Sequence, residues 1–337
     1  MRKTIIFAAI AAIALTACNQ NVVPAVAEDQ QEISINSIAL TKGYVEGVNF
    51  TETAFDKLHD ASAVQADRKL WMSAYLTPQS GTPGNYFVGQ EFSKNANGET
   101  DNLWHHAPKV YWPIGAQSVD FLAYSALAPI SGTALNWNAD NAASKLVLDV
   151  SEDYLQDDIL FGAVAGRQTN AGAPVAMTFK HAQAWIQFQI KVEDASMENI
   201  VKIQDITIDN LYTRGELTIN GGATPSASWN FKKEIAAAFP MADTFEILDP
   251  AFISSTVGYM DMLVPEQAQT AFVMHYTLAG QDNALEYRYE LGTATWEQGK
   301  KYIYEITIKP YEIIVEPTVT AFDVVNPGAT GFPSVLE

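Results

Sequence analysis

Cysteine is almost absent from this sequence, and its scarcity excludes several kinds of site. Cys18 is the only cysteine among 337 residues. One cysteine forms neither an internal disulfide nor a thiolate metal cluster. Cys18 also lies close to the N-terminus, so the folded part of the chain has no thiol nucleophile. We expect neither a metal site nor a cofactor.

Basic residues are few as well. The sequence has 20 Lys and Arg against 39 Asp and Glu, a formal net charge of -19. Binding to nucleic acid needs clustered positive charge, because the phosphate backbone supplies most of the affinity. The composition therefore excludes nucleic acid as a partner. The acidity itself is read as a solubility feature.

Long apolar runs are missing beyond the first residues. The run from Ile5 to Leu15 follows Arg2 and Lys3 and is too short to span a bilayer, which takes roughly 18 residues. Residues 1–18 therefore read as a secretory signal peptide. Its end, Leu-Thr-Ala-Cys, resembles the lipobox of bacterial lipoproteins, which implies that Cys18 carries a lipid and anchors the chain to a membrane. The alternative is an ordinary signal with a chance cysteine. Residues 19–32 lack periodicity and are expected to be a flexible tether.

Catalytic motifs are absent too. The sequence contains no G-x-S-x-G elbow, phosphate-binding glycine loop or H-E-x-x-H. His105 and His106 are adjacent and would face opposite sides of a strand, so they are expected to pack at a surface or corner rather than to chelate a metal. Residues 95–101 carry oxygen ligands, but Gly98 comes too early for a calcium loop. We expect no enzyme; a glycan-processing enzyme is the alternative, although no carboxylate pair is marked.

What the sequence does contain is alternation of apolar and polar residues, clearest in residues 174–192. One face of its second half carries Ile186, Phe188, Ile190 and Val192, and the other carries Gln187, Gln189 and Lys191. Side chains of a strand point alternately to its two faces, so this pattern predicts a strand with one wet face. The glycine-rich residues 166–173 precede it, and a second domain is expected to begin here.

Similar short segments run along the whole chain and predict an all-β fold of two β-sandwich domains in tandem, with few short helices. The expected domains are residues 33–170 and 171–310. Residues 51–69 have weak helical spacing, and 231–239 could form a helical turn. Residues 201–209 and 216–219 are expected to pair as strands. The tail, residues 311–337, contains a β-prone segment with Ile313, Val315, Val319, Phe322 and Val324, interrupted by Pro317.

Several motifs in order resemble the fimbrillin family, the type V pilins of anaerobic bacteria. They are Tyr-Trp-Pro at 111–113, VDFLAYS at 119–125, DILFGA at 158–163, FKHAQA at 179–184 and GKKYIYEITI at 299–308. Each motif alone is weak, but the ordered set covers nearly the whole chain. The resemblance implies two transthyretin-like sandwiches and export as a lipoprotein.

The resemblance also implies a way of assembly. In that family, a trypsin-like protease removes the N-terminal strand, and the C-terminal strand of another subunit fills the groove that this opens. Residues 33–40 fit the removable strand, and the apolar residues of the tail fit the donor strand. The family cut follows an arginine, whereas this chain has Lys42 and Gly43 at that position, and its first arginine beyond the leader is Arg68. Either Lys42 is cut, or the strand stays in place.

The expected function is a structural subunit of a cell-surface fimbria that serves adhesion at the cell outer membrane. Its expected partners are other pilin subunits, the membrane through lipid on Cys18, and a host protein or glycan. The alternatives are a pilus tip adhesin, an anchor subunit, or a stand-alone surface lipoprotein that binds glycan or host protein through loops such as residues 77–85.

Overall fold

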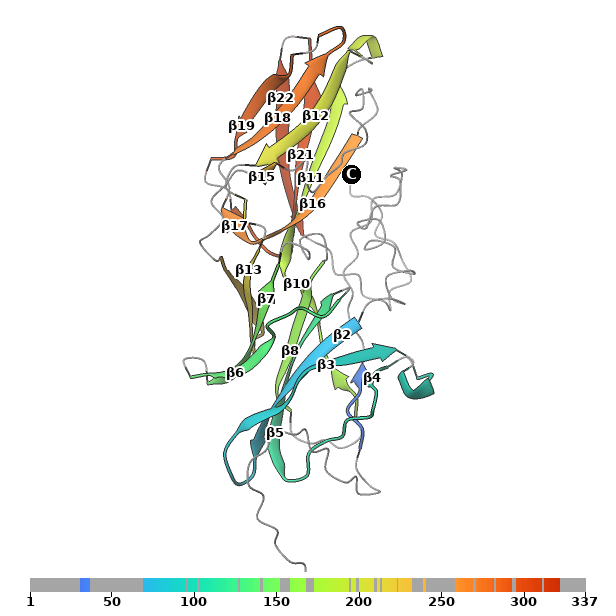
Figure 1. The fold of residues 1–337 in the computed structure, drawn as a ribbon, viewed down its shortest axis with the longest axis vertical. Coiled ribbons are helices and arrows are strands. Elements are labelled where there is room, and N and C mark those ends of the chain that lie inside the picture. The colour runs from blue at the N-terminus through green and yellow to red at the C-terminus, as the bar shows by residue number, and fades with distance from the viewer. Residues whose placement is uncertain are drawn as a thin grey trace, which may run out of the picture. The chain divides into compact units, whose positions relative to one another are not determined.

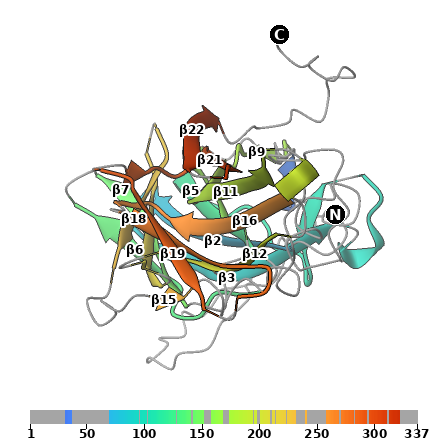
Figure 2. The ribbon, with the colours of Figure 1, turned by 90° about the horizontal axis from the view of Figure 1, so that it is seen from above.

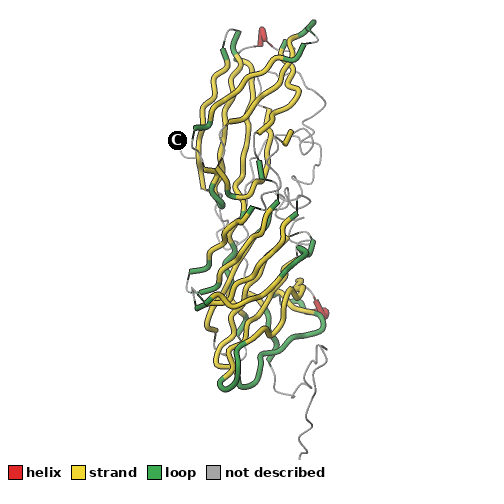
Figure 3. The backbone as a smooth tube through the Cα atoms, turned by 60° about the vertical axis from the view of Figure 1, so that its left-hand side comes forward, coloured by secondary structure: helices red, strands yellow, loops and turns green. Residues whose placement is uncertain are grey.

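The fold is described from a computed structural model of the chain. The structure describes residues 31–36, 69–94, 96–101, 103–126, 128–139, 142–151, 158–167, 173–193, 195–197, 200–208, 211–212, 214–222, 224–231, 239–240, 258–268, 271–281, 283–292, 295–310 and 312–321. Within these residues the secondary structure is β, apart from two 3-10 helices of one turn, η1 (Ala96–Gly98) and η3 (Ala195–Met197) (Figures 1 and 3). The predicted all-β class is confirmed. The expected helices over 51–69 and 231–239 lie almost wholly outside the described residues.

Twelve strands form the two sheets that contain the N-terminal half of the chain. The larger sheet has the order β10-β8-β5-β2-β3-β4-β1-β9, and the smaller has the order β14-β13-β7-β6. Their bounds are β1 (Ile35–Asn36), β2 (Lys69–Pro78), β3 (Gly84–Lys94), β4 (Trp104–His106), β5 (Ala116–Ala126), β6 (Ala134–Asn138), β7 (Ala143–Val150), β8 (Leu160–Arg167), β9 (Val175–Ala176), β10 (Lys180–His181), β13 (Gly215–Asn220) and β14 (Ser226–Asn230).

The central strands of the larger sheet are buried on both faces. In β2, Leu70 and Met72 belong to one core cluster, while Trp71 belongs to another that also holds Leu146 of β7 and Leu217 of β13. The second cluster is therefore the layer between the two sheets. Burial on both faces explains why residues 121–124 of β5 form an unbroken apolar run rather than alternating.

The remaining strands form two four-stranded sheets and one two-stranded sheet. Their orders are β16-β11-β21-β22, β15-β12-β18-β19 and β17-β20. Their bounds are β11 (Gln183–Val192), β12 (Val201–Ile208), β15 (Phe239–Pro240), β16 (Gly258–Pro265), β17 (Gln267–Ala268), β18 (Ala271–Leu278), β19 (Leu285–Glu290), β20 (Thr295–Trp296), β21 (Lys300–Ile308) and β22 (Ile313–Ala321). In Figure 2, β22 lies beside β21 at the edge of its sheet.

The core between these two sheets follows the predicted alternation. Ile186, Phe188, Ile190 and Val192 are all buried in one cluster, with Phe188 against Phe272 and Tyr304 at ring-centroid distances of 4.9 and 5.4 Å. Gln187, however, was expected on a wet face and is 2% exposed. It accepts a hydrogen bond from Gln189 Nε2 at 2.7 Å, so the opposite face of β11 is not fully solvated.

The strands do not change sheet at the expected domain boundary. β9 pairs with β1 and β10 pairs with β8, although both strands follow residue 171. β13 pairs with β7 and β14, so the expected pairing of residues 201–209 with 216–219 is wrong; β12 pairs instead with β15 and β18. Alternation identifies strands but not their partners, because any strand with one apolar face satisfies the same pattern.

Candidate functional site

The first described segment, residues 31–36, lies as a strand between two neighbours. On one side, the Ile33 N–H donates to Val110 O at 2.8 Å, and the Trp112 N–H donates to Gln31 O at 2.9 Å. On the other side, β1 runs parallel to β9, and the Val175 N–H donates to Ser34 O at 2.8 Å. We call the space that this segment fills the first-strand slot. Gln31 and Glu32, expected to end the flexible tether, are part of the paired segment.

The segment also contributes side chains to the core. Ile33 and Ile35 are both 0% exposed and pack in one cluster with Trp104, Trp112 and Val175. Burial of an isoleucine stabilises a fold by about 2 kcal/mol. If the segment left, the slot would present an apolar groove flanked by unpaired backbone groups, which is the kind of surface that captures an extended strand.

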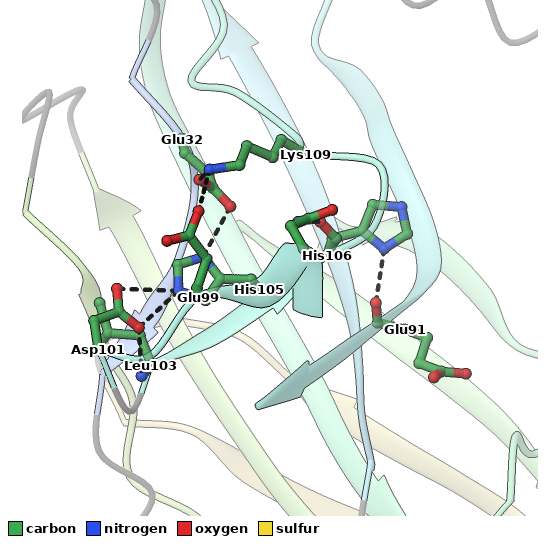
Figure 4. Close-up of polar contacts among 9 residues, drawn as sticks. Glu32, Glu91, Glu99, Asp101, Leu103, His105, His106 and Lys109 are labelled. Atoms are coloured by element: carbon green, nitrogen blue, oxygen red, sulfur yellow. Dashed lines mark hydrogen bonds and ion pairs between the residues drawn. The ribbon is translucent and has the colours of Figure 1, made fainter. Parts of the chain in front are cut away.

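A cluster of charged side chains holds the start of this segment (Figure 4). Glu32 Oε1 lies 2.8 Å from His105 Nδ1, and its Oε2 lies 2.8 Å from Lys109 Nζ. His105 Nε2 lies 3.0 Å from Asp101 Oδ1, and Lys109 also pairs with Glu99. The His105 side chain is 5% exposed and that of Glu32 is 17% exposed, so water screens the innermost contact weakly. We call these five residues the Glu32 cluster.

The charges of the Glu32 cluster support one another. Burial alone would lower the pKa of His105, but hydrogen bonds to Asp101 and Glu32 outweigh it and leave that pKa raised. The hydrogen bond to His105 lowers the pKa of Asp101. Hydrogen bonds to Glu32 and Glu99 raise the pKa of Lys109. Each shift favours the ionised form, so the cluster is a network of opposite charges around one carboxylate of the first strand.

The sequence did not reveal this cluster. His105 was expected at a surface or corner, but it is buried among acids. His106 fits that expectation better: its ring packs against Phe92 at a centroid distance of 5.6 Å, and its Nδ1 lies 2.7 Å from Glu91 O at the surface. The sequence offered one sign of the cluster: Asp101 lies four residues before His105, close enough for the two side chains to pair. Glu32 was beyond prediction, because its 73-residue separation from His105 is bridged only by the fold.

The candidate donor strand is the edge strand β22. It pairs antiparallel with β21, and Ile308 and Ile313 lie opposite each other at the start of the hairpin. Ile313 and Val315 are partly buried against the core cluster of their own sheets, whereas Val319 is 54% exposed. The beginning of β22 thus completes its own sandwich, and its second half faces solvent.

Several predicted site residues lie outside the described part of the chain. These are Cys18 as the lipidation site, Lys42 and Gly43 as the cleavage site, and Phe322 and Val324 in the donor strand.

Two further histidines each lie against an aspartate. His181 Nδ1 lies 2.6 Å from Asp158 Oδ1, both buried, and His275 pairs with Asp205. No three His, Cys, Asp or Glu residues of the described ranges are arranged to hold a metal ion. Among the same residues, no helix has the length and apolar character needed to cross a membrane.

Comparison with known proteins gives a family. A family model described as Fimbrillin-like matches residues 59–322. No curated protein matches the chain in sequence. Solved structures with a similar fold include a proposed cell adhesion protein from Bacteroides uniformis, with 16% identity and a TM-score of 0.52, covering 88% of this chain and 100% of that one. Two others are a proposed cell adhesion protein from Bacteroides ovatus (12% identity, TM-score 0.49, 88% and 99% covered) and a fimbrial protein from Bacteroides vulgatus (15%, 0.46, 87% and 99%).

Proposed function

This chain belongs to the fimbrillin-like family, and we propose that it is a structural subunit of a fimbria assembled by strand exchange. A fimbrial or adhesive role places it at the cell surface. The observation that carries the proposal is the first-strand slot, where a short N-terminal segment supplies two fully buried isoleucines to a core built by later strands.

Such a segment can be replaced by another strand of the same pattern. Its contacts are backbone hydrogen bonds on two sides and the burial of Ile33 and Ile35. An incoming strand would restore the same stabilisation, about 2 kcal/mol for each buried aliphatic side chain and about 1 kcal/mol for each hydrogen bond. Loss of the first strand therefore creates a site that only an equivalent strand fills well.

Proteolysis provides the trigger. A cut after Lys42 would separate the first strand from the rest of the chain and leave it held by noncovalent contacts alone. The lysine at this position calls for a protease that accepts lysine as well as arginine.

The donor is the C-terminal tail of a neighbouring subunit. Support comes from β22, an edge strand whose second half, including Val319, is exposed and available to another chain. Residues 322–325 (Phe-Asp-Val-Val) continue its apolar character in the sequence. A tail strand at a sheet edge with exposed apolar positions fits a stalk subunit, which must both donate and accept a strand.

Export as a lipoprotein explains how the subunit reaches the surface. Cys18 ends the apolar leader, and we propose that lipid on this residue holds the precursor at the outer membrane until the cut releases it from its anchor. Two tandem transthyretin-like sandwiches are the proposed architecture of the mature subunit.

An anchor subunit at the base of the fimbria is the second candidate. Lysine rather than arginine at position 42 favours it, since an uncut chain keeps both its lipid and its first strand. Such a chain donates its tail but accepts none. A tip adhesin is less favoured, because a tip has no need of a donor tail.

Limited proteolysis tests the stalk proposal. We would treat the full chain with trypsin, run it unboiled on a denaturing gel, and compare it with Lys42→Arg and Lys42→Ala variants. The proposal expects a ladder of oligomers from the wild type and Lys42→Arg, none from Lys42→Ala, and none from a chain that ends at residue 311. A wild-type chain that is completely cut at Lys42 and stays monomeric would overturn it.

A further inference from the structure

The Glu32 cluster places two cationic side chains on a single carboxylate of the first strand. His105 comes from β4 and Lys109 from the segment that follows it, and they bind different oxygens of Glu32 (Figure 4). Glu32 directly precedes the part of the strand that holds the two buried isoleucines, in the order Glu32, Ile33, Ser34, Ile35. The contacts of this carboxylate therefore determine which residues of the strand are buried in the slot.

We propose that the first-strand slot selects a strand with a carboxylate immediately before its two buried aliphatic side chains, and that His105 and Lys109 bind this carboxylate. The part that concerns a second subunit rests on the strand exchange proposed above. A carboxylate at this position does two things. It gives acceptors to two donors that would otherwise lose a charged partner, and it fixes the register.

A captured strand can bind in more than one register. A shift by one residue turns every side chain to the opposite face, and a shift by two keeps the faces but misplaces the ends. Apolar pockets discriminate poorly between such alternatives when the strand carries several aliphatic residues in alternation. A buried charge pair discriminates strongly, because a misplaced strand leaves the charges uncompensated.

The tail of a second copy has the required order. Residues 312–315 read Glu-Ile-Ile-Val, matching Glu-Ile-Ser-Ile at residues 32–35. In its own subunit the Glu312 side chain is 60% exposed and lies 3.3 Å from Lys309 Nζ in the hairpin turn. Residues 305–308 read Glu-Ile-Thr-Ile, but they lie in β21, which is paired on both sides. β22 pairs with β21 on one side only, so its exchange requires residues 313–321 to detach from β21 and from their own core as one strand. The structure then points to Glu312 of a second copy, at the start of that detached strand, as the carboxylate that replaces Glu32.

We call the contacts of His105 and Lys109 with the Glu32 carboxylate the clamp. The charge of His105 makes the clamp sensitive to pH. The charged groups that face His105 are Glu32 from the first strand and Asp101 from the segment before β4. From β3, its cross-strand neighbour is the uncharged Ser93. Below the ordinary pKa of about 6.5, His105 is charged whether or not the strand is bound. As the pH rises through its raised folded-state pKa, His105 loses its charge and the grip on the carboxylate weakens.

Hydrogen exchange on the full chain tests the clamp without any second subunit. We expect Glu32→Gln to raise the intrinsic-rate-corrected exchange of the amides in residues 31–36 about tenfold. His105→Gln should do the same at pH 6 and remove most of the difference between pH 6 and pH 8.5. The matched controls are His106→Gln, next in the same strand, and Glu91→Gln, which pairs only with Lys69 among the described contacts. Equal exchange in Glu32→Gln and wild type would overturn the clamp.

Assembly after the cut at Lys42 tests the register. Glu312→Gln should reduce the oligomer ladder about tenfold at limiting concentration, while Glu316→Gln, an exposed acid of the same strand, should leave it unchanged. Equal ladders from both variants would overturn the assignment of Glu312 while leaving strand exchange intact. If even the wild type forms no ladder, strand exchange and the role of Glu312 both fail, and the hydrogen-exchange result still decides whether the native strand is clamped.

Discussion

At the residue scale, the two isoleucines of the first strand and the charges beside them account for how the slot is filled. Ile33 and Ile35 contribute buried apolar side chains to the core, and the ion pairs of the Glu32 cluster fix the position of the strand in the slot. Neither the burial of the two isoleucines nor the ion pairs of Glu32 could be predicted from the sequence. Residues 33–40 are a strand candidate in the sequence, but the burial of Ile33 and Ile35 depends on Trp104 and Val175, which come from distant segments.

Truncation of a buried isoleucine in the slot should be costly. Ile35→Ala is expected to lower the free energy of unfolding by about 2–4 kcal/mol, because it removes buried methyl groups and leaves a cavity. Ile114→Ala is the control, since Ile114 is 79% exposed and its loss should change stability by less than about 0.5 kcal/mol. Urea unfolding of both variants checks this. Similar losses for the two would mean that the first strand is not part of the core.

Gly162 illustrates a glycine that packing requires. A Cβ added to it would lie 2.9 Å from Thr178 O and 3.0 Å from Met177 Cγ. Gly162→Ala is therefore expected to destabilise the fold by about 1–3 kcal/mol. Gly84→Ala is the matched control, because a Cβ there meets no atom within 4 Å. Thermal unfolding of both variants would show whether only the first shifts the midpoint.

The pH dependence of stability should carry the signature of His105. Its raised pKa means that the folded state binds the proton more tightly, so its contribution is full below about pH 6.5 and is lost as the pH rises through the folded-state pKa. The difference in unfolding free energy between wild type and His105→Gln should therefore be larger at pH 6 than at pH 8.5. His106→Gln, the next residue of the same strand and outside the Glu32 cluster, is the matched control. A larger difference at pH 8.5 would contradict the assignment.

At the element scale, the sequence predicted strands well and their partners poorly. The apolar face predicted for β11 is confirmed, since Ile186, Phe188, Ile190 and Val192 are all buried in one core cluster. The pairing of residues 201–209 with 216–219 was wrong, because β13 joins β7 from an earlier part of the chain. The residues of β13 themselves do not determine which strand it pairs with. The pairing depends on which apolar face each strand finds in the assembled core, such as Leu217 against Leu148 and Trp71.

The edge strand β22 should divide into two functional halves. Val315→Thr is expected to cost about 1 kcal/mol of stability, because Val315 packs against the core of its own sandwich. Val319→Thr should leave stability unchanged, because that side chain is 54% exposed. If the exposed half donates to another subunit, Val319→Thr should instead weaken oligomers, as read on unboiled gels. Equal stability losses for both variants would contradict this division.

At the scale of the whole molecule, the all-β class and the fimbrillin resemblance could be predicted from the sequence, because many weak motifs recur in order along it. The matching family model agrees with that resemblance over residues 59–322. The net charge of -19 has a consequence here, since like-charged subunits repel one another and assembly needs specific strand contacts to overcome that repulsion. Oligomer yield should therefore rise with salt, which screens the repulsion.

Peptide mass mapping of the assembled polymer tests strand exchange most directly. Full chain would be cut, allowed to assemble and separated from monomer, and the subunits of the polymer would be digested and mapped. If strand exchange builds the polymer, the subunits that accept a neighbour lack residues 33–42 and retain the tail from residue 312 onward. A polymer in which every subunit keeps residues 33–42 would contradict it.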